Sequence, residues 1–282
     1  MIDLSVIILN YNMKGLVKQC VRGIAANTPP CSTEVIVVDN ASIDGSTPIF
    51  DEWERTQPFP SITFRFLPRA TNDGYAVGNN EGVRIAQGSV VLILNPDIAV
   101  LKGSIELLLE YLNKHPNVAV VGPKLLNPDK SIQYSCFRFP TLMTPLYRRT
   151  ILSQWPTGKQ HLKEYMMTDW DHESTRRVDW IMGSAMVLRK NAIEHVGGLD
   201  EQFFMYYEDI DWCRRFWQSG YEIHYVPHAQ MVHYHQRLSA QTSVVKNLSS
   251  WATRTHIRSA IHYYLKYHQT PLPQKDLVSS TL

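Results

Sequence analysis

Three continuous aliphatic runs, separated by helical patterns, are the feature that most constrains the fold of this chain. The runs occupy residues 4–9, 34–38 and 90–94. Strands of this kind are buried on both faces, as in a parallel sheet that is covered by its crossover helices. Residues 17–24 supply one such helix, with apolar residues spaced i, i+3, i+4 and i+7. The pattern predicts an α/β fold, a three-layer α/β/α sandwich with a mostly parallel central sheet.

The rest of the chain contains further strand and helix patterns and one segment without a clear period. Strand patterns occupy residues 63–67, 179–190 and 221–226, and helical patterns occupy residues 76–87 and 105–112. A helix begins near Glu208, and we expect its Cys213 to face the core and its Arg214 to face the solvent. Residues 131–178 are rich in aromatics, Arg and Pro without a clear period, so we expect an irregular excursion over the sheet.

The predicted organisation is one domain over residues 1–240, whose two halves meet at about residue 127, followed by a short extension over residues 241–282. A helical pattern over residues 247–268 places Ile257, Ile261, Tyr264 and Leu265 on one side, beside a basic stripe of Arg254, Arg258 and Lys266.

Two interpretations of this C-terminal helix stay open. A basic amphipathic helix can rest at the surface of an anionic membrane. Alternatively, its apolar side packs against the catalytic domain or against a second subunit in a homodimer.

Length, charge and cysteine content exclude several classes of protein. The 282 residues suffice for one large core, and a net charge of +2 is too small to indicate a nucleic-acid partner. Four scattered cysteines without a CxxC pair favour reduced thiols. No apolar run approaches the ~18–20 residues that span a bilayer. We therefore expect a cytoplasmic protein that is either soluble or peripheral on the inner face of the cytoplasmic membrane.

Polar residues follow three of the predicted strands where each strand ends. Asn10 and Tyr11 follow the first, Asp39 follows the second, and Asn95 and Asp97 follow the run at 90–94. Open α/β sheets bind ligands outside the carboxyl ends of their strands. Each residue alone could simply cap the next helix. Three strand ends together favour a ligand site.

Three signals near this edge suggest metal or phosphate contacts. Asp97 follows a proline that fixes the chain direction, and its carboxylate suits a hard divalent cation, although a plain Asn-Pro turn is the alternative. His233 and His235 have the spacing of a ligand pair, but surface histidines are common. Amides of the loop that contains Asn72 and Gly74 could contact a ribose or a phosphate, and an ordinary turn also uses these residue types.

Three acids at a helix start, Glu208, Asp209 and Asp211, suggest catalysis. The helix dipole and an Asp211–Arg215 pair explain Asp211 without any function. Glu208 and Asp209 remain, and a carboxylate that faces an aromatic-lined cleft is a candidate general base.

A second side of the site is expected in residues 131–178 and in the segment that contains Trp180, Gly183 and Ser184. Aromatic rings there offer flat apolar faces to a bound molecule. The alternative is that these rings only cover the sheet.

Seven segments together resemble glycosyltransferase family 2 and, within it, the rhamnosyltransferase-like branch. The resemblance is ordered along the chain from about residue 3 to residue 240, and it implies the GT-A fold of the nucleotide-diphospho-sugar transferases. The segments are SVIILNYN (5–12), VVDNASIDGS (37–46), NDGYAVGNN (72–80), LNPD (94–97), WIMGSAM (180–186), GGLD (197–200) and FFMYYEDID (203–211).

The resemblance implies roles for individual residues. Asp39 would hydrogen-bond the pyrimidine base of the donor. Asp97 stands in the place of the family's DxD motif and would coordinate a divalent metal, Mg²⁺ or Mn²⁺, whereas the first acid of that motif is Asn95 here. Asp209 would deprotonate the acceptor hydroxyl. His233 would be a second metal ligand, but the Gly that usually follows it is missing, which keeps His235 as a rival.

The implied function is an inverting glycosyltransferase of bacterial cell-surface polysaccharide synthesis. It would transfer rhamnose or another deoxysugar from a dTDP- or UDP-sugar to a hydroxyl of a glycan or lipid-linked acceptor. The nucleotide-sugar half of the catalytic domain would then be about 1–127 and the acceptor half about 128–240, with Trp180, Gly183 and Ser184 on the acceptor side. A sugar nucleotidyltransferase is one alternative, but it needs a Gly-rich basic loop where this chain has only Lys14. A catalytically silent sugar-nucleotide-binding protein is another, and it would not need both Asp97 and Asp209.

Overall fold

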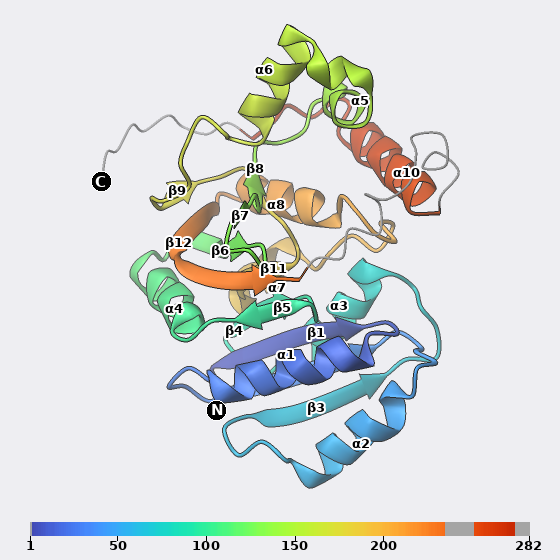
Figure 1. The fold of residues 1–282 in the computed structure, drawn as a ribbon, viewed down its shortest axis with the longest axis vertical. Coiled ribbons are helices and arrows are strands. Elements are labelled where there is room, and N and C mark those ends of the chain that lie inside the picture. Colours follow the sequence, from blue (N-terminus) through green and yellow to red (C-terminus); the bar gives the residue numbers. More distant parts are fainter. Residues whose placement is uncertain (1, 235–250, 274–282) are drawn as a thin grey trace.

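The computed structural model describes residues 2–234 and 251–273, and its centre is one large sheet (Figure 1). The main strands are β1 (Leu4–Asn10), β2 (Thr33–Asp39), β3 (Thr63–Pro68), β4 (Val90–Leu94), β5 (Ile98–Val100), β6 (Val118–Leu126), β11 (Ala185–Arg189) and β12 (Glu222–His233). They are ordered β3-β2-β1-β4-β11-β6-β12-β5. Strands β3, β2, β1 and β4 are parallel, β12 is parallel to β6, and β11 runs antiparallel to both of its neighbours. The predicted mostly parallel sheet is confirmed.

Helices cover both faces of the sheet because alternate strand residues point to opposite sides. Val6 and Ile8 belong to one core cluster, and Ile7 between them belongs to the other. The helices of the first cluster are α1 (Lys14–Ala26), α2 (Ser46–Thr56) and α4 (Ser104–Lys114). Those of the second are α3 (Tyr75–Ile85), α7 (Lys190–Val196) and α8 (Glu208–Gln218). The architecture is the expected three-layer sandwich.

The expected irregular excursion over residues 131–178 contains regular structure, so that prediction was wrong in part. Its elements are β7 (Ile132–Gln133), β8 (Cys136–Phe137), α5 (Met143–Arg149), the 3₁₀ turn η1 (Ile151–Gln154), α6 (Pro156–Tyr165) and β9 (Arg176–Arg177). Each is too short to show a period in the sequence. Pro156 begins α6, where its missing N–H costs no helical hydrogen bond.

The strand expected over residues 179–190 is interrupted. It consists of β10 (Trp180–Ile181), which pairs with β8, and of β11, which pairs with β4 and β6. Between the two lie Gly183 and Ser184, which contact the candidate site described below. Lys190, expected at the strand's end, begins α7.

The C-terminal helix α10 (Trp251–Lys266) packs through a face other than the predicted one. Its buried residues include Ser259, Ala260 and Tyr263, whereas Ile257 and Ile261 of the expected apolar side are exposed. Small side chains allow α10 to approach the domain closely, and Ser259 Oγ donates to Met205 O at 2.8 Å. Residues 247–250 of the predicted helix lie outside the described part of the chain.

Because α10 covers α8, the expectation that Arg214 faces the solvent was also wrong. Arg214 is buried, and its guanidinium donates to Tyr263 Oη and to the carbonyl oxygens of Thr270 and Pro271. Lys266 adds ion pairs to Asp200 at 2.6 Å and to Asp211 at 2.7 Å. The C-terminal helix is therefore tied to the helix that begins with Glu208 and Asp209.

Within residues 2–234 and 251–273, no helix combines the length and the apolar character required to cross a bilayer. The four cysteines are all free thiols.

Candidate active site

The carboxyl ends of β1 and β2 bring Asn10 and Asp39 side by side. The two residues are partners in the parallel register, and Asn10 Nδ2 donates to Asp39 Oδ1 at 2.6 Å. Asn10 also donates to Ser42 and Ser46, and Ser42 Oγ donates to Asp39. Both side chains are buried, while Tyr11 beside them is 48% exposed. A carboxylate has about four lone-pair positions, so Asp39 keeps acceptor capacity beyond these bonds.

The loop that contains Asn72 and Gly74 closes over this edge. Asn40 Nδ2 donates to Asn72 Oδ1 at 3.2 Å and to Gly74 O at 3.0 Å. Gly74 has a positive φ of 97°, and a Cβ on it would lie 2.2 Å from Phe204 O. Only glycine fits this close approach. The contact joins the loop to the segment that leads into α8, which carries Asp209.

Asp97 and His233 meet at the other side of the edge. Asp97 Oδ1 lies 3.2 Å from His233 Nε2, and His233 Nδ1 pairs with Gln133 Oε1 at 2.7 Å. Because Gln133 Oε1 is an acceptor, His233 Nδ1 carries the hydrogen and donates this bond, which leaves the Nε2 lone pair directed toward Asp97. A carboxylate oxygen and an imidazole nitrogen at this separation suit two neighbouring ligands of one divalent cation.

The described residues provide no group of three or more His, Cys, Asp or Glu side chains for a metal. A cation held by Asp97 and His233 therefore needs further ligands from outside that set, such as the donor's phosphates or water. The rival His235 lies outside the described residues, and His228 is exposed. Asn95 contributes its backbone here, since its N–H donates to Ser184 O at 2.8 Å.

A hydrogen bond from Gly183 connects Asp209 to the same site. The Gly183 N–H donates to Asp209 Oδ2 at 3.0 Å, and the N–H of the next helix residue, Ile210, donates to Asp209 Oδ1 at 2.9 Å. Tyr75 Oη donates to Gly183 O at 2.6 Å. Since the next residue, Ser184, accepts from Asn95, one short turn connects the base candidate to the strand end that carries Asp97.

Burial changes the acidity of both acids at the start of α8. Desolvation raises the pKa of Asp209 to about 6, although the amides of Gly183 and Ile210 oppose the shift. Burial and the charges of Asp209 and Asp211 raise the pKa of Glu208 well above its ordinary value. Asp209 is thus the stronger candidate base, because it is mostly ionised at neutral pH yet more basic than an exposed aspartate.

The Trp180 ring is not open to a ligand as predicted. The ring is 5% exposed and stacks on Phe137 at a centroid distance of 4.6 Å, and its Nε1 donates to Arg138 O at 2.8 Å. The ring face that was expected to receive an acceptor is therefore covered. Ser184 is buried as well, and Gly183 contacts Asp209 as described.

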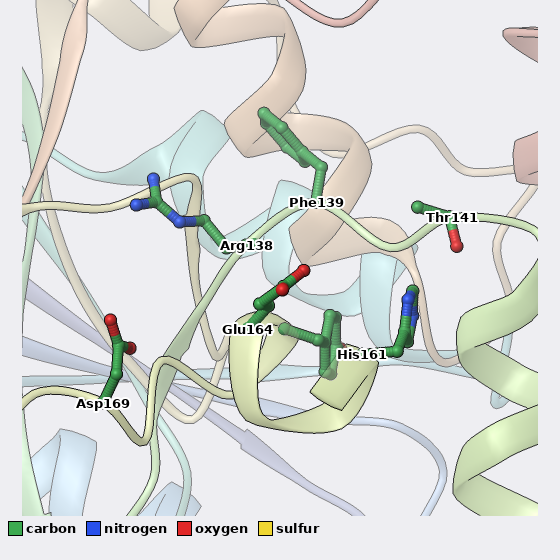
Figure 2. Close-up of a pocket in the computed structure, with 7 residues that line it drawn as sticks. Arg138, Phe139, Thr141, His161, Glu164 and Asp169 are labelled. Carbon is green, nitrogen blue, oxygen red and sulfur yellow. The ribbon is translucent and has the colours of Figure 1, made fainter. Parts of the chain in front are cut away.

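A pocket of about 330 Å³, within the size range of small-molecule sites, lies between residues 138–141 and α6. Figure 2 shows its residues Arg138, Phe139 and Thr141 along one stretch of chain, facing His161 and Glu164 on α6. Tyr165 also lines it. Burial raises the pKa of Tyr165, and the charge of Arg148 opposes this increase. The charge of Asp209 raises the Tyr165 pKa further, so the pocket lies close enough to the base candidate to feel its charge.

Two residues at the site received no role from the sequence. Tyr75 lies inside the 72–80 segment and close to several acids. Burial is the largest cause that raises its pKa, and the negative charges of Glu208, Asp209 and Asp97 raise it further. Its position after Gly74 was a usable signal. Gln133 had no signal, because its role depends on a two-residue strand that brings it to His233.

Solved structures with a similar fold are glycosyltransferases of the GT-A type. Mannosyltransferase PcManGT from Pyrobaculum calidifontis, solved with GDP-Man and Mn²⁺, matches with a TM-score of 0.57 and 17% identity over 97% of this chain and 79% of that one. GalNAc-T7 with UDP, GalNAc and Mn²⁺ matches with a TM-score of 0.62 and 13% identity over 95% of this chain. This chain spans 50% of that protein's length.

Curated relatives extend the likeness to sequence. N-acetylglucosaminyl-diphospho-decaprenol L-rhamnosyltransferase from Mycobacterium tuberculosis is 30% identical over 240 residues, which cover 79% of this chain and 73% of the relative. Rhamnosyltransferase WbbL from Escherichia coli is 27% identical over 217 residues, covering 73% and 76%. The family model for glycosyl transferase family 2 matches residues 5–168, and a second, for glycosyl transferase family group 2, matches residues 140–257. This chain is a glycosyltransferase that belongs to glycosyl transferase family 2.

Proposed function

We propose that this enzyme transfers L-rhamnose or a related deoxysugar, with inversion, from a dTDP- or UDP-linked donor to a hydroxyl of a glycan or lipid-linked acceptor. The rhamnosyltransferase names of the relatives support the donor class, and the decaprenol-linked substrate named for the mycobacterial relative supports the acceptor class. The observation that carries the chemistry is the position of Asp209, a carboxylate with a pKa of about 6 joined through Gly183 and Ser184 to the Asp97 strand end.

The chain's own residues have distinct roles in the proposed reaction. Asp39, Asn72 and Gly74 hold the nucleotide and its ribose. Asp209 accepts the proton of the acceptor hydroxyl while the hydroxyl oxygen bonds to the anomeric carbon and the bond from that carbon to the diphosphate breaks. Attack from the face opposite the leaving group inverts the anomeric configuration. Burial raises the pKa of Glu208 well above its ordinary value, so we assign the base role to Asp209, which the Gly183 N–H orients.

Asp97 and His233 are the proposed metal ligands, and a bound Mg²⁺ or Mn²⁺ would supply Lewis-acid stabilisation of the negative charge on the departing diphosphate. Gln133 keeps the His233 ring in the orientation that this requires. The pocket between residues 138–141 and α6 is the proposed entrance for the acceptor, and its Arg138 and His161 provide polar contacts.

The test is a donor screen followed by product analysis. We expect dTDP-rhamnose with Mn²⁺ to raise the melting temperature more than GDP-mannose does, because a ligand that binds only the folded state stabilises it. NMR of the transferred sugar should then show the inverted anomer. A retained anomer, or a product that forms equally well in excess EDTA, would contradict the proposed mechanism.

A catalytically silent binder predicts a different result. It would show the same thermal shift with no transfer and no donor hydrolysis. A nucleotidyltransferase is disfavoured because the one basic residue of the first loop, Lys14, is engaged within the protein: its Nζ donates to Asp44 O in the loop between β2 and α2.

A further inference from the structure

Exposed apolar side chains concentrate at one end of the molecule, on helices that cover the acceptor half. Figure 1 shows α5, α6 and α10 together at the end opposite α2 and β3. The α10 side chains of Ile257, Ile261 and Leu265 are 43%, 55% and 66% exposed. In the neighbouring segment Leu142 and Ile151 are 72% and 71% exposed. Exposed apolar side chains that adjoin one another mark an interaction surface, whereas scattered ones are ordinary.

The two groups adjoin one another. Tyr264 Oη on α10 donates to Thr141 O at 2.6 Å, and Leu142 follows Thr141 directly. Ile261 is three residues before Tyr264, so it lies on the neighbouring stripe of the same helix. We call the surface made by residues 142–155 and by the outer side of α10 the apical surface.

Basic residues outnumber acids on the helices at this end. The described stretches 142–155 and 251–273 include Arg148, Arg254, Arg258 and Lys266 and hold no Asp or Glu, whereas α6 carries Glu164 in its last turn. Arg254 and Arg258 lie exposed on the outer side of α10 beside Ile257 and Ile261. The acids that face α10 from the domain, Asp200 and Asp211, are paired with Lys266 on its inner side.

We propose that the apical surface docks on an anionic lipid bilayer. Apolar side chains flanked by arginines, with Trp155 and Trp251 more than half exposed, match a membrane interface, where tryptophan and basic residues both anchor. A second copy of this chain fits the same surface less well, because a two-fold interface would bury this basic surface against the identical basic surface of the other copy. Docking would place the acceptor pocket, which lies beside Thr141, close to the lipid.

The test is co-sedimentation of the full chain with phosphatidylcholine vesicles, with and without phosphatidylglycerol. We expect binding only with phosphatidylglycerol at low salt and release at high salt. The triple variant Ile257→Ser/Ile261→Ser/Leu265→Ser should lower the partition coefficient at least ~10-fold. Arg254→Gln/Arg258→Gln should lower it about fivefold per residue. The matched control, Leu101→Ser/Leu107→Ser, removes two exposed apolar side chains from elsewhere and should bind like the unchanged chain.

Three outcomes would overturn the docking proposal. The intact chain could stay in the supernatant with anionic vesicles at low salt. Both apical variants could bind as well as the control while their circular dichroism melts show a normal fold. Light scattering could show a dimer that the triple variant converts to a monomer, which would make the surface a subunit interface. Vesicle binding requires neither donor nor turnover, so its failure would leave the proposed transfer reaction untouched.

Discussion

Asp209 shows how burial and hydrogen bonding act on the same carboxylate in opposite directions. Two backbone N–H groups stabilise its charge, yet desolvation is the larger effect and raises its pKa to about 6. Asp39 receives hydrogen bonds mainly from side chains and lies at the end of a strand. These different environments are consistent with the different tasks proposed for the two acids, proton transfer for Asp209 and nucleotide contact for Asp39.

Asp209→Asn should abolish most turnover and increase stability at neutral pH. Loss of a general base costs ~100-fold or more in kcat. The folded pKa lies above the ordinary value, so the ionised form costs stability at pH above about 6, and this cost disappears below pH 4, where the group is neutral in both states. We expect the variant to gain about 1–2 kcal/mol at pH 8 and nothing at pH 4, measured by urea unfolding.

The matched control for this change is Asp51→Asn, since Asp51 is exposed on α2. It should alter neither kcat nor the unfolding midpoint. A stabilisation by Asp209→Asn that is equal at pH 4 and pH 8 would show that the gain does not come from the buried charge.

Gln133→Leu tests the orientation of His233. Without the Oε1 acceptor, the imidazole loses the bond that fixes its Nδ1 proton. Mutation of such a supporting residue typically weakens metal binding ~10–100-fold. We expect the Mn²⁺ concentration for half-maximal activity to rise in this range, while kcat at saturating Mn²⁺ changes little. Unchanged Mn²⁺ dependence would remove Gln133 from the site, and Gln160→Leu on the surface of α6 is the control.

At the scale of elements, the sequence predicted those whose burial alternates with a clear period. The helix stripe Val17, Cys20, Val21 and Ile24 is the buried face of α1. The short elements of residues 131–178 escaped prediction because a helix of seven to ten residues shows at most two or three turns. The face of α10 was mispredicted because Ser259 and Ala260 pack by close approach and carry little hydrophobic signal.

Gly74→Ala tests whether the loop over the carboxyl ends of β1 and β2 depends on its close contact with the segment that leads into α8. The new Cβ would overlap Phe204 O, and the backbone has a positive φ. We expect a loss of about 1–3 kcal/mol in stability and a weaker thermal shift with donor. Gly15→Ala in α1 meets nothing within 4 Å and should be neutral or slightly stabilising. Equal melting temperatures for both variants would contradict this interpretation of Gly74.

At the scale of the whole molecule, the strand ends predicted from the sequence do come together, but their connection to the base could not be predicted. Asn10, Asp39 and Asp97 follow strands of one sheet, so their common edge follows from parallel topology. The contacts of Gly183 with Asp209 and Tyr75 join residues more than 25 positions apart through an interrupted strand, which no local pattern reveals. No local pattern reveals the packing of α10 against α8 either, where Tyr263 and Lys266 contact Arg214 and Asp211.

Tyr263→Ala should show that α10 belongs to the same cooperative unit as the catalytic domain. Tyr263 is 1% exposed and accepts a hydrogen bond from buried Arg214, so its removal leaves a cavity and an under-bonded guanidinium. We expect a loss of about 3–5 kcal/mol, seen as a lower urea midpoint with an unchanged slope and a single transition. Ile261→Ala, on the exposed side of the same helix, should change stability by less than ~0.5 kcal/mol. If Tyr263→Ala instead produced an early separate transition with Asp209-dependent activity intact, α10 would be an independent appendage.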